Sequence, residues 1–186
     1  MGPRRRLGGE GLNSLSTLPA ILPDVLEPGL LVVFCGSAAG TVSARRGAYY
    51  AHPQNRFWAT LHEIGLTPRQ LAPEEFRTLP RYRLGLTDLA KHVSGSDASL
   101  PRDADDPEAL RERIRAAAPG VLAFNGKRPA GVFFRHLFGI RTLDYGPQSQ
   151  TIGATAIVVL PSTSPSARGF WTLSPWLALA RHVENL

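Results

Sequence analysis

The sequence predicts an α/β fold in three αβα layers, with a central, mainly parallel sheet between helices. Short apolar runs alternate with amphipathic stretches of helical periodicity. The runs at 30–35, 121–124 and 154–160 are largely apolar rather than alternating, which is typical of parallel strands buried on both faces. Small or polar residues follow each run, as expected where a strand ends and a loop begins.

The first half of the chain predicts a helix and a further strand beside the first apolar run. The helix is expected at 55–64, because its apolar residues share one face and Gly65 follows as a stop. A capping box at 67–70, with proline at the first helical position, predicts the start of another helix. The strand is expected at 83–87 and ends at Asp88.

The second half continues the alternation of strands and helices. Proline at the first helical position favours two of the helix starts. The expected elements are a polar surface loop at 94–106, a helix at 106–118, a strand at 121–124, a helix at 129–138, a strand at 154–160 and a helix at 174–185.

Length and composition indicate one folded domain at 18–186, preceded by a tail. The chain of 186 residues is long enough to bury a substantial core, and its hydrophobic content of 43% is ordinary for a globular protein. Residues 1–17 contain an arginine triplet, several glycines and few apolar side chains. This composition predicts a flexible basic tail.

The charge balance favours a polyanionic partner. The formal net charge is +6, and every cationic side chain other than Lys91 and Lys127 is an arginine. Arginine is suited to bidentate contacts with phosphate. No apolar run is long enough to span a membrane, and no secretory signal is recognisable, so we expect a cytoplasmic protein. Cys35 lies in a predicted buried strand and is expected to be an inert core thiol.

Two loops early in the chain predict a binding site. Gly36, Gly40 and the small residues between them follow the first strand, where the backbone can approach a ligand and its N–H groups can act as donors. The segment 45–53 adds two arginines and two tyrosines. Together these groups suit an anionic, aromatic ligand such as a nucleotide. The spacings of a P-loop and of a dinucleotide-binding fingerprint are both absent.

Four ordered motifs resemble those of the mismatch-specific uracil-DNA and thymine-DNA glycosylases. The first is G-S-A-A-G at 36–40 followed by A-H-P-x-N-x-F-W at 51–58, where the family reads G-I-N-P-G in the loop. The later motifs are Y-R-L-G-L-T-D-L at 82–89, F-N-G-K at 124–127 and L-P-S-T-S-P-S-A-R at 160–168. The resemblance extends from about residue 22 to the end of the chain.

The resemblance implies a uracil-DNA glycosylase-like fold and a monofunctional DNA glycosylase. Such an enzyme flips uracil out of the stack, with G·U mismatches as the expected substrate, and hydrolyses its glycosidic bond in base excision repair. The implied partner is double-stranded DNA with a damaged or mismatched base. We expect a monomer that associates with the nucleoid and uses neither a metal nor another cofactor.

The first motif departs from the family at its catalytic position. The family's catalytic asparagine is the third residue of the first loop, where this chain has Ala38, and a methyl group cannot position water. Asp88 is our candidate for the missing catalytic group, since a carboxylate at a strand end can activate water or stabilise a positively charged sugar. Alternatively, Asp88 caps the following turn.

Base binding is assigned to Ser37, Tyr50 and Asn125. We expect the backbone amides of Ser37 and Tyr50 to hold the edge of the base. Tyr50 also matches the aromatic position whose ring stacks on the flipped base in the family. Tyr50 could instead be a core tyrosine. The Asn125 side chain offers donors and an acceptor for a base edge or a water, or it is a left-handed turn residue before Gly126.

The closing loop is assigned to DNA contact. Ser162, Ser164 and Ser166 are expected to bind phosphates, and Ala167 and Arg168 to lie near the wedge that fills the vacated stack. The family has G-L-S where this chain has P-S-A, so the wedge is smaller. A surface turn is the alternative reading of this segment.

Several other polar residues are given structural roles. We expect His52 to brace its loop, Asn55 to cap the next helix and Tyr49 to be structural, while Lys127 binds phosphate or caps a carbonyl. The histidines show no metal-ligand spacing. The remaining candidates among the acids look solvated, and they are Asp97, Asp103, Asp105 and Asp106.

Two other functions compete with uracil excision. Relatives that remove deaminated purines such as hypoxanthine also lack the loop asparagine. A damaged-DNA binding protein without catalysis would also be consistent with Ala38, although Asp88 argues against it. A nucleoside hydrolase is disfavoured, because the acidic cluster expected for ribose and calcium is missing.

Overall fold

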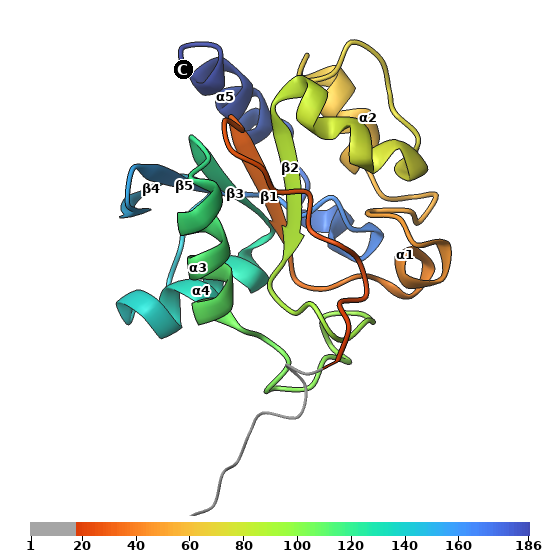
Figure 1. Cartoon of the computed structure of the whole chain (residues 1–186), viewed down its shortest axis with the longest axis vertical. Coiled ribbons are helices and arrows are strands. Elements are labelled where there is room, and N and C mark those ends of the chain that lie inside the picture. The colour runs from red at the N-terminus through yellow and green to blue at the C-terminus, as the bar shows by residue number, and fades with distance from the viewer. Residues whose placement is uncertain (1–17) are drawn as a thin grey trace, which may run out of the picture.

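A computed structural model describes residues 18–186 and contains one five-stranded sheet (Figure 1). The strand order is β2-β1-β3-β5-β4, and β4 alone runs antiparallel to its neighbour. This arrangement confirms the predicted α/β class with a mainly parallel sheet. The strands are β1 (Val32–Gly36), β2 (Leu84–Asp88), β3 (Val121–Asn125), β4 (Gly146–Ile152) and β5 (Thr155–Leu160).

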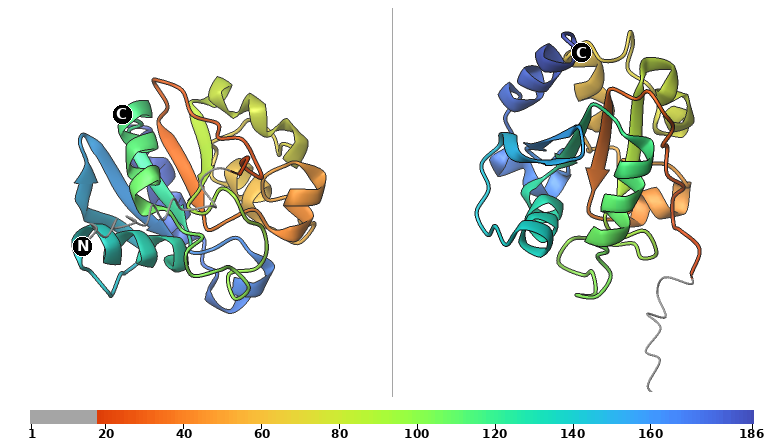
Figure 2. Two further views of the ribbon diagram at one scale, coloured as in Figure 1. Left: turned by 60° about the horizontal axis from the view of Figure 1, so that its bottom comes forward. Right: turned by 60° about the vertical axis from the view of Figure 1, so that its left-hand side comes forward.

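Helices cover both faces of the sheet, which gives the three layers (Figure 2). On one face lie α1 (Thr41–Arg46), α2 (Phe57–Glu63), the 3-10 helix η1 (Pro73–Tyr82) and α5 (Ser174–Val183). On the other face lie α3 (Pro107–Ala117) and α4 (Lys127–Phe138).

Alternation along the strands builds two separate cores. On β1, Val32 and Phe34 point toward the α2 and α5 side, whereas Val33 and Cys35 point toward α3 and α4. Because both faces are covered, the parallel strands are largely apolar on both faces rather than alternating, and their polar residues lie mainly at their carboxyl ends. Burial raises the pKa of the Cys35 thiol well above its ordinary value, as expected for a core cysteine.

The register brings the carboxyl ends of the parallel strands to one edge of the sheet. Gly36 at the end of β1 is opposite Asp88 at the end of β2, and Asn125 at the end of β3 is opposite Leu160 of β5. The loops after these strands therefore converge, as we expected for the loops after β1, β3 and β5. This edge is where open α/β sheets bind ligands.

Several predicted helix boundaries are confirmed by their capping contacts. Asp106 Oδ1 accepts the backbone N–H of Ala109 at 2.9 Å at the start of α3. Gly139 adopts a left-handed conformation, φ 69°, after α4. Asn55 Oδ1 accepts the N–H of Phe57, the first residue of α2, at 3.0 Å, so Asn55 supports the helix start as predicted, although Arg56 occupies the N-cap position itself.

The helix start predicted at 67–70 is wrong. No helix begins there, and the Thr67 hydroxyl donates to the carbonyl of Arg69 at 2.9 Å instead of accepting a backbone N–H of a first helical turn. The 3-10 helix η1 begins later, at Pro73, and there Glu75 accepts the N–H of Ala72 at 2.8 Å. Three further elements had no sequence prediction, namely α1, β4 and the 3-10 helix η2 (Pro165–Phe170).

The predicted basic tail, residues 1–17, lies outside the described residues. Within 18–186, no helix is long and apolar enough to cross a membrane.

Candidate active site

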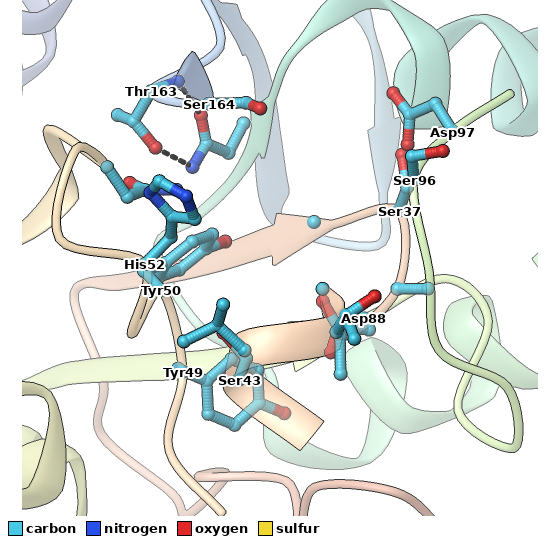
Figure 3. Close-up of a pocket in the computed structure, with 18 of the residues that line it drawn as sticks. Ser37, Ser43, Tyr49, Tyr50, His52, Asp88, Ser96, Asp97, Thr163 and Ser164 are labelled. Carbon is cyan, nitrogen blue, oxygen red and sulfur yellow. Dashed lines mark hydrogen bonds between the residues drawn. The ribbon is translucent and has the colours of Figure 1, made fainter. Parts of the chain in front are cut away.

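A cavity of about 360 Å³ opens at the carboxyl edge of the sheet (Figure 3). Its lining comes from parts of the chain that are distant in the sequence: the loop after β1 with the following segment to Asn55, the end of β2 with the loop after it, the end of β3, and the loop after β5. Its polar lining includes Ser37, Ser43, Tyr49, Tyr50, His52, Asn55, Asp88, Ser96, Asp97, Asn125, Ser162, Thr163, Ser164 and Ser166.

Most of the predicted site residues line this cavity together. Gly36, Ala38 and Gly40 also line it, from the loop after β1. Ala167 and Arg168 do not line it; they lie in η2, and Arg168 is exposed. Their assigned role is contact with the DNA stack outside the pocket, and this role stays a prediction, as do those of the pocket residues.

Backbone hydrogen bonds hold the loop after β1 against the segment that follows β2. The N–H groups of Leu89 and Ala90 donate to the carbonyls of Gly36 and Ser37 at 2.9 and 2.7 Å. The N–H of Gly95 donates to the carbonyl of Ala39 at 2.9 Å. The loop that replaces the family's asparagine with Ala38 is thus tied to the strand end that carries Asp88.

Asp88 is buried in the floor of the cavity, with 3% of its surface exposed. It is the register partner of Gly36, and a Cβ placed on Gly36 would lie 2.7 Å from Asp88 Oδ1. Only glycine leaves room for the carboxylate at this point. Within 18–186, no hydrogen bond from a backbone N–H to the Asp88 carboxylate supports the alternative of a turn cap.

The environment of Asp88 raises its pKa from 3.8 to about 6. The main cause is burial, which penalises the charged form. Lys91 and Arg113 oppose the rise, and the carboxylate of Asp24 adds to it. A carboxyl with a pKa near neutrality is suited to accept a proton and release it again.

A cluster of charged residues lies beneath Asp88 and was not predicted. Asp24 forms ion pairs with Lys91 at 2.8 Å and with Arg113 at 3.2 Å, and it accepts the Thr87 hydroxyl at 2.7 Å. Arg113 also donates to the backbone carbonyl of Asp88 at 2.8 Å. These residues come from three distant parts of the chain, so no local pattern could have grouped them.

Tyr50 lies against the cavity in an unusual backbone conformation, with φ 52°. Neighbouring contacts fix this turn: the Ser43 hydroxyl accepts the N–H of Ala51 at 3.0 Å, and Trp58 Nε1 donates to the carbonyl of Tyr49 at 3.0 Å. One side of the Tyr50 ring packs on Phe57, with ring centroids 4.1 Å apart. The ring is therefore held rigidly while it remains partly exposed to the cavity.

Asn125 is paired with Thr163 across the ends of β3 and β5 (Figure 3). Asn125 Nδ2 donates to Thr163 Oγ1 at 2.9 Å, and Asn125 Oδ1 accepts the backbone N–H of Thr163 at 3.0 Å. Asn125 belongs to β3, and the positive φ of 120° falls on Gly126, so the alternative of a left-handed Asn125 is wrong. Much of its hydrogen-bonding capacity is already used to fix the closing loop.

Serine side chains shape the closing loop. Ser162 Oγ accepts the N–H of Ser164 at 3.2 Å, and Ser164 Oγ accepts the N–H of Ser166 at 3.4 Å. The hydroxyls of Ser164 and Ser166 lie 2.9 Å apart. These bonds order the loop locally and leave the hydroxyls within reach of a ligand at the cavity mouth.

The expected structural residues fall largely as predicted. His52 Nδ1 accepts the N–H of Gln54 at 3.1 Å, which braces its loop. Tyr49 is buried, and its hydroxyl donates to the carbonyl of Pro23 at 3.1 Å. Lys127 lies over the ring of Tyr145, 4.6 Å from the centroid, rather than at a carbonyl.

The expectation of a solvated Asp105 is wrong, because its side chain is 7% exposed and forms a bidentate pair with Arg128 at 2.7 and 2.9 Å. This pair ties the loop before α3 to the start of α4. Among residues 18–186, no group of three or more His, Cys, Asp or Glu side chains is arranged to hold a metal ion.

A parallel sheet with a buried carboxylate and a rigid aromatic ring in a pocket at its carboxyl edge defines an α/β protein with a site of nucleotide size. The chain belongs to the uracil DNA glycosylase superfamily, whose family model matches residues 23–181. The fold is similar to the solution NMR structure of a candidate uracil DNA glycosylase from Methanosarcina acetivorans, with a TM-score of 0.62. That similarity has 29% sequence identity and covers 88% of this chain and 96% of the other. Membership in the superfamily supports a DNA glycosylase activity.

Proposed function

We propose that this protein is a monofunctional DNA glycosylase that removes uracil from double-stranded DNA, with G·U mismatches as its substrate. The observation that carries this proposal is the buried carboxylate of Asp88, which shares one pocket with the rigid Tyr50 ring. Ala38 stands where the mismatch-specific uracil-DNA and thymine-DNA glycosylases have their catalytic asparagine, so the chemistry needs another group. Asp88 is the acidic side chain that is buried at this pocket.

The reaction makes demands that the site can meet. Breaking an N-glycosidic bond builds positive charge on the sugar and negative charge on the departing base. An ionised Asp88 offsets the sugar's charge and accepts a proton from the attacking water. Its burial strengthens both effects, because the low dielectric of the pocket screens charges less than water does.

The flipped base is proposed to bind against Tyr50. Its ring has Phe57 on one side, so the side that faces the cavity is available for stacking. Base stacking of this kind is worth roughly 1–3 kcal/mol. The backbone N–H groups of Ser37 and Tyr50 are proposed to hold the polar edge of the base. Asn125 contributes by holding the closing loop through Thr163.

The closing loop and η2 are proposed to contact the DNA backbone and the vacated stack. Ser162, Ser164 and Ser166 line the cavity mouth, and the exposed Arg168 follows them in η2. The side chain of Ala167 is small, so it fills little of the space left by the flipped base. Discrimination of the opposite guanine is expected to be correspondingly modest.

A substrate panel tests the function directly. The full-length protein would be incubated with duplexes containing U·G, U·A, T·G or hypoxanthine·T, and with single-stranded uracil DNA. We expect excision to be fastest from U·G and to leave an abasic site whose strand breaks only after alkali. A protein that excises no base yet binds U·G duplexes more tightly than matched ones would be a damage-binding protein.

Hypoxanthine is the second candidate substrate, and Ala38 favours it. A methyl group at this position occupies less of the cavity than an asparagine side chain and imposes no hydrogen-bonding pattern on the base. Faster excision from hypoxanthine·T than from U·G would select this alternative.

A further inference from the structure

The hydroxyl of Tyr50 is buried at the pocket and has no protein acceptor for its hydrogen among the described residues, although the Asn125 side chain lies close enough to lower its pKa. Within residues 18–186, three buried side-chain atoms have no hydrogen-bond partner, and Tyr50 Oη is the one that belongs to a residue lining the cavity. A buried donor without a partner typically costs about 1–3 kcal/mol. Native proteins usually satisfy such groups with a ligand or an ordered water, so this hydroxyl is expected to have a partner in solution.

The Tyr50 hydroxyl and the Asp88 carboxylate flank the same small space. A Cβ placed on Gly36 would lie 2.7 Å from Asp88 Oδ1 and 3.2 Å from Tyr50 Oη. Both oxygens therefore lie close to one point beside the Gly36 backbone, where a side chain would clash with the carboxylate. A water that bridges the two oxygens would lie further from the backbone than this point.

The hydrogen-bonding roles at this space are complementary. Burial, and next the nearby charge of Asp88, raise the pKa of Tyr50 well above its ordinary value, and the neighbouring Asn125 side chain opposes this rise only in part. The phenol therefore remains a donor, whereas the ionised carboxylate of Asp88 only accepts. A water between them accepts from Tyr50 and donates to Asp88, which leaves it one lone pair for a third partner.

We propose that Tyr50 and Asp88 together hold the water molecule that attacks the sugar, so that the Tyr50 hydroxyl is a second catalytic group. This inference rests on the proposed glycosylase function and goes beyond the stacking role of the ring. It also explains how the chain can lack a polar side chain at position 38. The water that asparagine would otherwise position is held by Tyr50 and Asp88 instead.

The step balances as a hydrolysis. The water oxygen forms a bond to C1′ of the deoxyribose while the bond from C1′ to the base nitrogen breaks, and the bonding electron pair leaves with the base. One water proton passes to Asp88, which later releases it to solvent. The departing base anion takes a proton from solvent, and the Tyr50 hydroxyl keeps its own proton throughout.

A high-resolution crystal structure of the unmodified protein tests the water site without any need for activity. We expect an ordered water within about 3 Å of both Tyr50 Oη and Asp88 Oδ1. Tyr50→Phe should lose this water without moving the ring, because the contact with Phe57 does not involve the hydroxyl. A parent structure without a water at this point would overturn the proposal.

Single-turnover excision by three variants tests the catalytic role. Tyr50→Phe should excise about tenfold more slowly than the parent and bind lesion DNA equally well, because it loses one hydrogen bond to the water and keeps the ring. Tyr50→Leu should lose binding as well. Gly36→Ala should be slower than Tyr50→Phe, since its methyl group clashes with the Asp88 carboxylate as well as crowding the water position.

Gly131→Ala is the matched control for the glycine change, because a Cβ at Gly131 in α4 meets nothing within 4 Å. It should excise at the parent rate. If the parent structure contains the water but Tyr50→Phe excises as fast as the parent, the water has only a structural role and the proposal that it is the nucleophile is overturned. If the parent excises no base but the water is present, the proposed function fails and the nucleophile role falls with it, whereas the water site itself stands.

Discussion

Asp88 and Asn125 end two parallel strands at the same pocket, yet their surroundings differ. Asn125 is hydrogen-bonded to Thr163 through both its donor and its acceptor. The carboxylate of Asp88 is buried beside a glycine, with its charge balanced from below by residues that do not cap it. Position at a strand end therefore does not by itself identify a reacting group. The unused hydrogen-bonding capacity of its side chain is what distinguishes Asp88 from Asn125.

The largest expected effect is on the rate of excision, which should depend far more on Asp88 than on Asn125. Asp88→Asn keeps the shape of the side chain and removes the charge, so single-turnover excision should fall by about 10²–10⁴. The matched control is Asp97→Asn, an exposed acid at the same pocket, which should retain the parent rate. Excision at the parent rate in Asp88→Asn would remove Asp88 from the mechanism.

The rate of excision by the unmodified protein should rise as the pH rises through about 6, since only the ionised carboxylate of Asp88 accepts a proton.

The second effect concerns stability and pH. The folded-state pKa of Asp88 is raised from 3.8 to about 6, so its protonated form favours folding at low pH and this contribution is lost as the pH rises through about 6. The amide that replaces the carboxyl in Asp88→Asn cannot ionise. In urea unfolding, the free energy of unfolding of Asp88→Asn relative to that of the parent should therefore rise by up to about 3 kcal/mol between about pH 4 and pH 7. A constant difference between the two proteins would mean that the folded-state pKa of Asp88 is not raised.

The third effect tests whether Asn125 has a structural rather than a catalytic role. Asn125→Ala removes both hydrogen bonds to Thr163 and leaves the buried backbone N–H of that residue without a partner. The free energy of unfolding should fall by about 2 kcal/mol. Excision should fall much less than in Asp88→Asn once the protein is kept below its unfolding temperature. A rate loss as large as that of Asp88→Asn would instead place the Asn125 amide on the substrate.

The smallest effect lies outside the pocket. Arg168→Gln should weaken binding to duplex DNA by a few-fold, with or without a lesion, and lower the slope of log affinity against log salt by about one. The rate of the bound complex should not change. A selective loss of lesion binding would show that Arg168 reads the distorted site rather than the phosphates.

The sequence predicted the layers of this fold and the strands that build the pocket. The buried strands were easy to recognise because both of their faces are apolar. Strand β4 was not, since it is an edge strand with mostly exposed or half-exposed residues. The 3-10 helices were missed as well, because their short turns lack a sustained helical period.

The candidate site was predictable only where its residues are close in the sequence or lie in a matched motif. The loop after β1 and the end of β2 fall in this group. The ion pairs of Asp24 with Lys91 and Arg113 join segments that are far apart in the chain, and no periodicity links them. The Asn125–Thr163 pair likewise depends on the register between β3 and β5.

The position of Asp24 has a consequence for how the protein is made. The backbone of Val25 bonds with Leu86 of β2, and Asp24 needs Lys91 and Arg113 as its partners. A ribosome delivers this carboxylate early, long before either cation has been synthesised. The cluster of charged residues beneath Asp88 therefore cannot form until well over half of the chain has been synthesised. The nascent N-terminal segment thus depends on late, long-range contacts.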